Sequence, residues 1–168
     1  AYIIGVHVTE NAVHKALFDE LTNKSSELNY CYDIYKINVV PIGKPIDDIN
    51  RMRGQLLGRD YVVPEAIKNN YSLVVDVHSN QGGAYVITNF AFAPAQDNVS
   101  KAIATKIIND NPGLQEYFPA SQTSPAYVTL PIQRSGTPTV LYEDYNNVTV
   151  PYVDLLIESV DTIFDYIS

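Results

Sequence analysis

Two histidines and a glutamate have the residue types and the spacing of a zinc site. The stretch GVHVTE, residues 5–10, places His7 and Glu10 three positions apart at the end of an apolar run. A chain that turns between them can direct an imidazole nitrogen and a carboxylate at one ion. The later stretch VVDVHSNQGG supplies His78 at the end of a second apolar run. Together the three side chains predict a metal site that keeps an open position for water.

The apolar periodicity predicts strands and helices that alternate along the chain. Strands are expected at residues 2–8, 30–40, 71–79, 84–93 and 137–145, and helices at residues 11–24, 64–70, 98–109 and 151–167. Residues 41–59 are polar and interrupted by Gly and Pro, and residues 114–136 are expected to be mostly loop with one short strand. Alternating strands and helices are typical of an α/β domain with a mostly parallel sheet, whose reactive groups gather beyond the carboxyl ends of the strands.

The candidate residues fall at such strand ends. His7 and His78 each end an apolar run, and Glu143 lies in the late strand TVLYEDY. Because strand side chains alternate, Asp76 shares a face with His78, so two polar groups are expected to point into one cavity. By the same alternation Tyr142 points away from Glu143.

Composition excludes several classes of function. The 168 residues are enough for one domain with a core of its own, and residues 1–168 are expected to form a single compact catalytic domain. A net charge of -8 opposes nucleic-acid binding. No segment approaches the roughly 20 apolar residues of a membrane span. The single cysteine, Cys31, excludes an intrachain disulfide. A start at Ala1 and four N-x-S/T triplets favour an exported or cell-envelope protein, although localisation and oligomeric state stay unknown.

Four motifs in order resemble the zinc carboxypeptidase-like superfamily, which includes metallocarboxypeptidases, aspartoacylases and succinylglutamate desuccinylases. The motifs read HVTE, DINR, VDVHS and TVLYEDY, and they span residues 7 to 143. The resemblance implies a three-layer helix-sheet-helix sandwich around a mixed, mostly parallel sheet. It also implies one Zn²⁺ ion held by His7, Glu10 and His78.

The resemblance assigns roles to further residues. Asp48 would accept a hydrogen bond from the other ring nitrogen of His7 and so fix its tautomer. Asn50 and Arg51 would hold a substrate carboxylate, a task suited to the planar guanidinium. Glu143 would be the general base toward the activated water, and with Arg51 it completes the expected catalytic pair. The expected substrate-binding residues are Asn50, Arg51, Arg134 and Ser79.

The chain also departs from the family pattern. It is much shorter than the well-known carboxypeptidases, and no residue clearly matches their oxyanion-stabilising arginine. Arg53, Arg59 and Arg134 are candidates, and Arg134 is expected near the pocket because its loop precedes Glu143. Tyr127 and Tyr142 fall where those enzymes carry a tyrosine that closes over the substrate.

The function expected from these residues is hydrolysis of a peptide or amide bond next to a carboxylate-bearing group. The substrate would be a small peptide with a free carboxyl terminus or an N-acyl amino acid. A catalytically degenerate binding module and a surface structural domain are the alternatives. His14 lies one helical turn after Glu10, where it is expected at the surface or boundary, with an alternative ligand set as the other interpretation.

Overall fold

A computed structural model describes residues 1–44, 48–82, 86–120, 123–145 and 151–163. Its sheet has the strand order β2-β1-β3-β6-β4-β5. The strands are β1 (Tyr2–Ile4), β2 (Ile34–Lys36), β3 (Val74–Asn80), β4 (Phe90–Phe92), β5 (Gln115–Glu116) and β6 (Thr139–Tyr145). Strand β4 runs antiparallel to β6, while the other neighbouring pairs are parallel. The sheet is therefore mixed and mostly parallel, as predicted.

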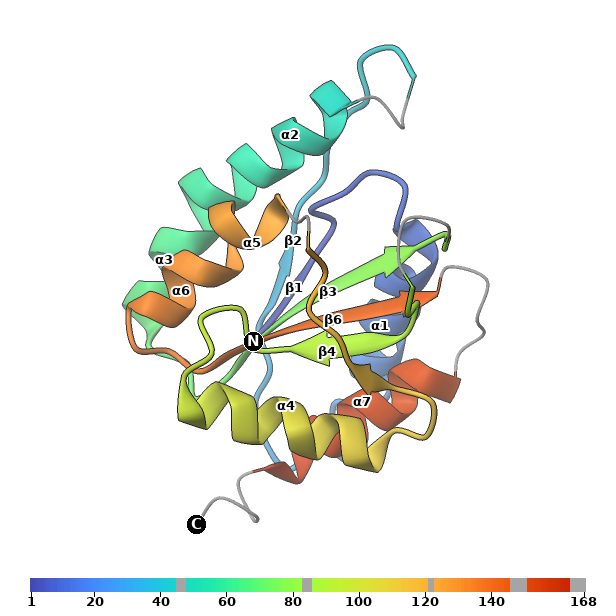
Figure 1. Ribbon diagram of the computed structural model, residues 1–168, viewed down its shortest axis with the longest axis vertical. Coiled ribbons are helices and arrows are strands. Elements are labelled where there is room, and N and C mark those ends of the chain that lie inside the picture. Colours follow the sequence, from blue (N-terminus) through green and yellow to red (C-terminus); the bar gives the residue numbers. More distant parts are fainter. Residues whose placement is uncertain (45–47, 83–85, 121–122, 146–150, 164–168) are drawn as a thin grey trace.

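Helices cover both faces of this sheet. They are α1 (Asn11–Asn23), α2 (Asp48–Leu57), α3 (Val63–Asn69), α4 (Asn98–Asp110), α5 (Ser124–Tyr127), α6 (Thr129–Arg134) and α7 (Pro151–Asp161), with a π-helical turn, η1 (Gly58–Val62), between α2 and α3. Figure 1 shows α1, α4 and α7 on one side of the sheet and α2, α3, α5 and α6 on the other. The predicted three-layer sandwich is confirmed. None of the helices in the described ranges is long and apolar enough to cross a membrane.

Alternation along the strands divides the core into two layers. Val75 and Val77 of β3 and Tyr142 of β6 join the cluster beneath α1, α4 and α7. Ile3 and Val74 point the other way and pack with residues of η1, α3 and α6. His78 follows Val74 by four positions and therefore lies on this second face. The same alternation buries Tyr142 away from Glu143, as predicted.

Several predicted elements are shorter than expected, and three helices were not predicted. Strand β1 ends at Ile4 because Gly5 takes a positive φ of 83°, so His7 lies in a turn beyond the strand. Helix α2 occupies part of the polar stretch 41–59, for which no helix was predicted, and α5 and α6 occupy part of the predicted loop at 114–136. Part of the predicted strand at 84–93 and the end of the predicted helix at 151–167 lie outside the described residues.

Gly54 explains why α2 was missed. Glycine in a helix usually lowers its stability, yet here a Cβ at position 54 would lie 1.8 Å from the carbonyl oxygen of Val6. Helix α2 therefore packs directly on the backbone next to His7. Gly5 is equally confined, because a Cβ there would lie 2.0 Å from the carbonyl oxygen of Ile37. The two glycines allow the His7 turn to lie between α2 and the segment that follows β2.

We expect Gly54→Ala to destabilise the protein by about 1–3 kcal/mol, despite the better helix propensity of alanine, because the methyl group meets rigid backbone. Gly58→Ala is the matched control, since a Cβ there would meet the Val128 side chain at 2.7 Å. A side chain can move more readily than backbone, so Gly58→Ala should lose less stability than Gly54→Ala. Urea unfolding measures the stability of both variants. A Gly54→Ala protein as stable as the wild type would contradict the close packing.

Candidate metal centre

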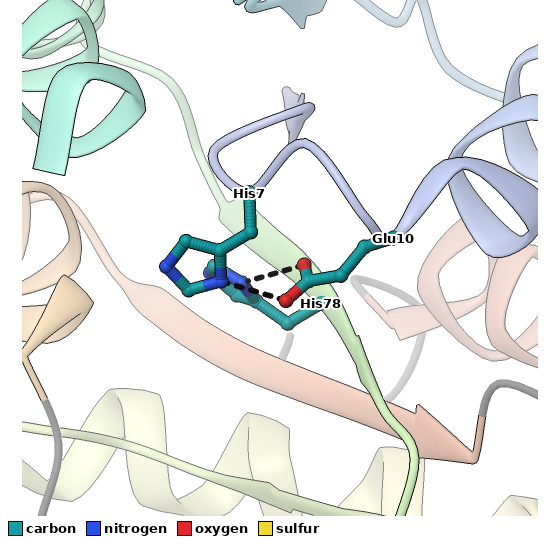
Figure 2. A group of neighbouring side chains, drawn as sticks. All are labelled: His7, Glu10 and His78. Atoms are coloured by element: carbon teal, nitrogen blue, oxygen red, sulfur yellow. Dashed lines mark hydrogen bonds and ion pairs between the residues drawn. The ribbon is translucent and has the colours of Figure 1, made fainter. Parts of the chain in front are cut away.

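His7, Glu10 and His78 come together in a buried group that could hold a metal ion. One ligand atom from each residue lies within 4.8 Å of the others. The side chains come from the turn after β1, the start of α1 and the end of β3, as Figure 2 shows. All three residues are at most 4% exposed. The three predicted ligands thus converge from segments that are far apart in the sequence.

Glu10 is the centre of this group. Its Oε1 lies 2.6 Å from His7 Nδ1, and its Oε2 lies 3.1 Å from His78 Nδ1. Figure 2 shows dashed lines from the carboxylate to both rings, whose centroids are 4.9 Å apart. Burial raises the pKa of Glu10, but the neighbouring imidazoles of His78 and His7 outweigh this effect and keep the pKa well below its usual range. Glu10 is therefore an ionised buried carboxylate.

His78 lies between two carboxylates. Its Nδ1 faces Glu10, and its Nε2 lies 3.0 Å from Asp76 Oδ1. The other oxygen of Asp76 accepts a hydrogen bond of 2.8 Å from Thr129 Oγ1. Burial lowers the pKa of His78, yet Asp76 and Glu10 together raise it well above its ordinary value. The sequence placed Asp76 on the correct face but did not reveal that it pairs with His78.

His7 has a different partner. Its Nε2 lies 3.2 Å from Gln55 Nε2, and Gln55 Nε2 also donates to Thr123 Oγ1 at 2.9 Å. Burial is the main cause of a lowered pKa at His7, so its ring is neutral near pH 7. The predicted partner at this nitrogen was Asp48. In the structure Gln55 takes that place, and no sequence motif pointed to it.

His14 is a buried structural histidine rather than the surface or boundary residue that we predicted. Its Nε2 donates to the carbonyl oxygen of Val77 at 2.9 Å, and its Nδ1 accepts from the backbone nitrogen of Gly5 at 3.2 Å. Since both ring nitrogens are engaged, His14 fastens α1 to β3 and to the turn that carries His7. Its Nε2 is also 3.6 Å from Glu10, so it adds a third imidazole near the carboxylate.

Glu143 lies on the strand next to His78. The two residues are register partners on β6 and β3, so their side chains leave the same face of the sheet. Both line a cavity of about 470 Å³, together with His7 and Glu10. Burial is the main cause that raises the pKa of Glu143 to about 8; His78 lowers this pKa, while Glu10 raises it further. Glu143 is thus a buried acid that titrates above its usual range.

The remaining predicted residues fall into two groups. Arg51, Asp48 and Ser79 line the cavity. Asn50 is fully buried, and its amide accepts from Ile42 N and donates to the carbonyl oxygens of Ile42 and Lys44. Asn50 therefore holds the segment before α2, and the amide expected to bind substrate is engaged by backbone.

Arg134 does not lie near the cavity, contrary to the prediction. It is exposed at the last position of α6, and the chain then enters β6 at its amino end. Glu143 lies toward the opposite end of this strand, which explains why a short separation in sequence does not bring Arg134 to the site. Arg53 donates instead to the carbonyl oxygen of Val40, and Arg59 pairs with Asp60 at the surface. Among the described residues, Arg51 is the one arginine that lines the cavity.

Comparison with known proteins supports the fold. No family model matches the sequence, and no curated protein matches it significantly. The structure resembles that of N-acetylmuramoyl-L-alanine amidase from Clostridium difficile 630, with a TM-score of 0.51 and 13% identity over 99% of this chain and 95% of that chain. Murine aminoacylase 3 aligns with a TM-score of 0.47 and 13% identity over 99% of this chain and 63% of that chain. At this identity the likeness to the amidase shows a shared fold, in agreement with the fold class implied by the four motifs.

The raised pKa of Glu143 has a measurable consequence in protein treated with a chelator. An unfolded glutamate ionises near pH 4.3, whereas folded Glu143 ionises at about pH 8. The stability that comes from its proton is full below the unfolded pKa and is lost as the pH rises toward 8. Glu143→Gln, which stays neutral, should therefore gain roughly 2 kcal/mol or more over the wild type between about pH 4.5 and 8.5.

Urea unfolding across this pH range provides the measurement. Glu116→Gln is the control, because it removes one carboxylate from an exposed strand. A stability difference between Glu143→Gln and the wild type that does not change with pH would contradict the burial of Glu143.

Proposed function

We propose that the chain is a zinc-dependent hydrolase of the carboxypeptidase-like superfamily, with residues 1–168 forming one catalytic domain. The observation that carries the proposal is the convergence of His7, Glu10 and His78 at a cavity that Glu143 also lines. Two imidazoles and one carboxylate are a ligand set typical of catalytic zinc in hydrolases. The order of the four motifs along the chain adds support.

The residues fit a zinc ion in their chemistry. Both histidines direct Nδ1 at the Glu10 carboxylate, and one ligand atom of each of the three residues lies within 4.8 Å of the others. The far nitrogen of each ring has a polar neighbour, Gln55 for His7 and Asp76 for His78. Ligating histidines usually have such partners, which orient the ring. When bound, Zn²⁺ supplies a Lewis acid that polarises a carbonyl group and lowers the pKa of water.

Glu143 is proposed as the general base. Its carboxylate would take a proton from the attacking water and pass it to the departing amine. A base works best when its pKa is near the working pH, and burial brings the pKa of Glu143 to about 8.

Arg51 is proposed to bind the substrate carboxylate. It lines the cavity and is near enough to lower the pKa of His7. Because the Asn50 amide is bonded to backbone, Arg51 would act without the second amide donor that the DINR motif implies. Ser79 is proposed as a polar contact from the end of β3. The substrate is a small peptide with a free carboxyl terminus or an N-acyl amino acid.

Zinc binding is the first test. We expect one zinc ion per chain when the protein is purified without chelator and its metal is counted by mass spectrometry. His7→Ala and His78→Ala should each weaken zinc binding by more than about 100-fold, the most that loss of an outer partner causes. His14→Ala is the control, since both ring nitrogens of His14 bond to backbone, and it should still bind one ion at saturating zinc. Wild-type protein that binds no zinc would end the proposal.

Turnover is the second test. Glu143→Gln should keep the zinc and lose about 10²–10⁴-fold in kcat, the usual contribution of a general base. Tyr142→Phe is the matched control, because the side chain of Tyr142 is next to Glu143 in sequence but is buried on the opposite face of β6. The substrate panel would contain carboxyl-terminal peptides, N-acyl amino acids and a muramoyl-L-alanine amide, the last because the amidase that shares this fold is named for that bond. A Glu143→Gln protein as active as the wild type would contradict this role.

A further inference from the structure

Gln55 is a buried polar residue that the proposed chemistry does not use. It lies on α2 and is 1% exposed. Its Nε2 contacts His7 Nε2 at 3.2 Å and Thr123 Oγ1 at 2.9 Å. Its oxygen, Oε1, is buried and has no hydrogen-bond partner within the described ranges of the chain. A buried amide oxygen without a partner is unfavourable and calls for an explanation.

The contacts of Gln55 and Glu10 agree on which nitrogen of His7 carries the proton. A carboxamide nitrogen is a donor only, so the lone pair of His7 Nε2 must accept from it. The proton of the neutral ring then lies on Nδ1, which donates to Glu10 Oε1 at 2.6 Å. In this tautomer His7 Nδ1 has no lone pair for a metal ion.

Ligation of a metal through Nδ1 requires the reverse arrangement. The proton must move to Nε2, and Nε2 then needs an acceptor. Rotation of the Gln55 carboxamide by half a turn places Oε1 where Nε2 now lies. Thr123 can follow this exchange, because a hydroxyl group both donates and accepts. Gln55 Oε1, the atom without a partner, is thus the acceptor that the metal-binding tautomer of His7 needs.

We propose that Gln55 is a positioning residue that sets the tautomer of His7 through the orientation of its carboxamide. It donates to Nε2 when Nδ1 is bonded to Glu10, and it accepts from Nε2 when Nδ1 binds the metal. The acceptor role of Gln55 rests on the proposed function, since it assumes a metal ion at His7. The donor role concerns the protein without metal and does not depend on catalysis.

A neutral amide in this place has a different effect from the carboxylate that Asp48 was expected to supply. A carboxylate only accepts, so it would hold the proton on Nε2 at all times. The amide can either donate or accept a hydrogen bond. The partners on the far sides of the two histidines therefore differ. His78 lies beside the fixed acceptor Asp76, whereas His7 has a partner that can reverse its polarity.

The test combines nitrogen NMR of the histidine rings with zinc titration. In chelator-treated wild-type protein, His7 should carry its proton on Nδ1, and one equivalent of Zn²⁺ should move it to Nε2. Gln55→Leu should keep the proton on Nδ1 in the chelator-treated protein, because Glu10 still accepts from it. In the zinc-bound form its Nε2 proton would have no acceptor, so Gln55→Leu should bind zinc about 10–100-fold more weakly. Gln55→Glu should hold the proton on Nε2 before zinc is added and should restore the affinity to at least that of the wild type.

Gln133→Leu is the matched control, because Gln133 is a buried glutamine of α6 whose Oε1 accepts from the backbone of Ala95. It should bind zinc within about twofold of the wild type, which separates the role of Gln55 from a general loss of packing. A Gln55→Leu protein that binds zinc as tightly as the wild type would overturn the inference. So would a chelator-treated wild type with its proton on Nε2. Wild-type protein that binds no zinc would overturn the proposed function, and the ring signals of the chelator-treated proteins would then decide the role of Gln55.

Discussion

A single buried carboxylate, that of Glu10, holds together the part of the molecule that carries the candidate site. A buried charge is costly unless it is paired, and both oxygens of Glu10 face imidazole nitrogens. These contacts connect the turn after β1 and the start of α1 to the end of β3. His14 strengthens the same junction through bonds to the backbone of Gly5 and Val77. The turn can follow this path because Gly5 and Gly54 allow backbone to approach it closely from both sides.

The charges of the site are arranged unequally around this carboxylate. His78 has acidic neighbours on both sides, Glu10 and Asp76, which raise its pKa. His7 contacts the neutral Gln55 on its far side, and burial lowers its pKa. Glu143 lies on the next strand and is buried near two other acids, so its pKa is raised to about 8. A divalent cation at the group would balance the acidic charge that accumulates there.

The sequence predicted the parts of the site that depend on local spacing. His7, Glu10 and His78 were found from residue type and strand ends, and the register of β3 with β6 brings Glu143 beside them. Strand alternation also predicted the opposite orientations of Tyr142 and Glu143. The layered fold followed from the alternation of strands and helices, and the helix at 11–24 was placed within one residue.

The sequence could not predict contacts made by distant segments. Gln55 reaches His7 only because α2 packs on the His7 turn, and the glycine that permits this contact resembles a helix breaker in the sequence. Asn50 matches the family motif, yet its amide bonds to the backbone of the segment before α2. Arg134 precedes Glu143 by nine positions, but Arg134 ends α6 before the amino end of β6, whereas Glu143 lies toward the carboxyl end of that strand.

The central claim is that two histidines and one glutamate bind a single divalent ion. Anomalous diffraction at the zinc edge from crystals grown with Zn²⁺ tests it most directly. One peak is expected, with Nδ1 of His7 and His78 and a carboxylate oxygen of Glu10 at about 2.0–2.2 Å. A peak held by other residues, or crystals with no peak at this group, would contradict the claim.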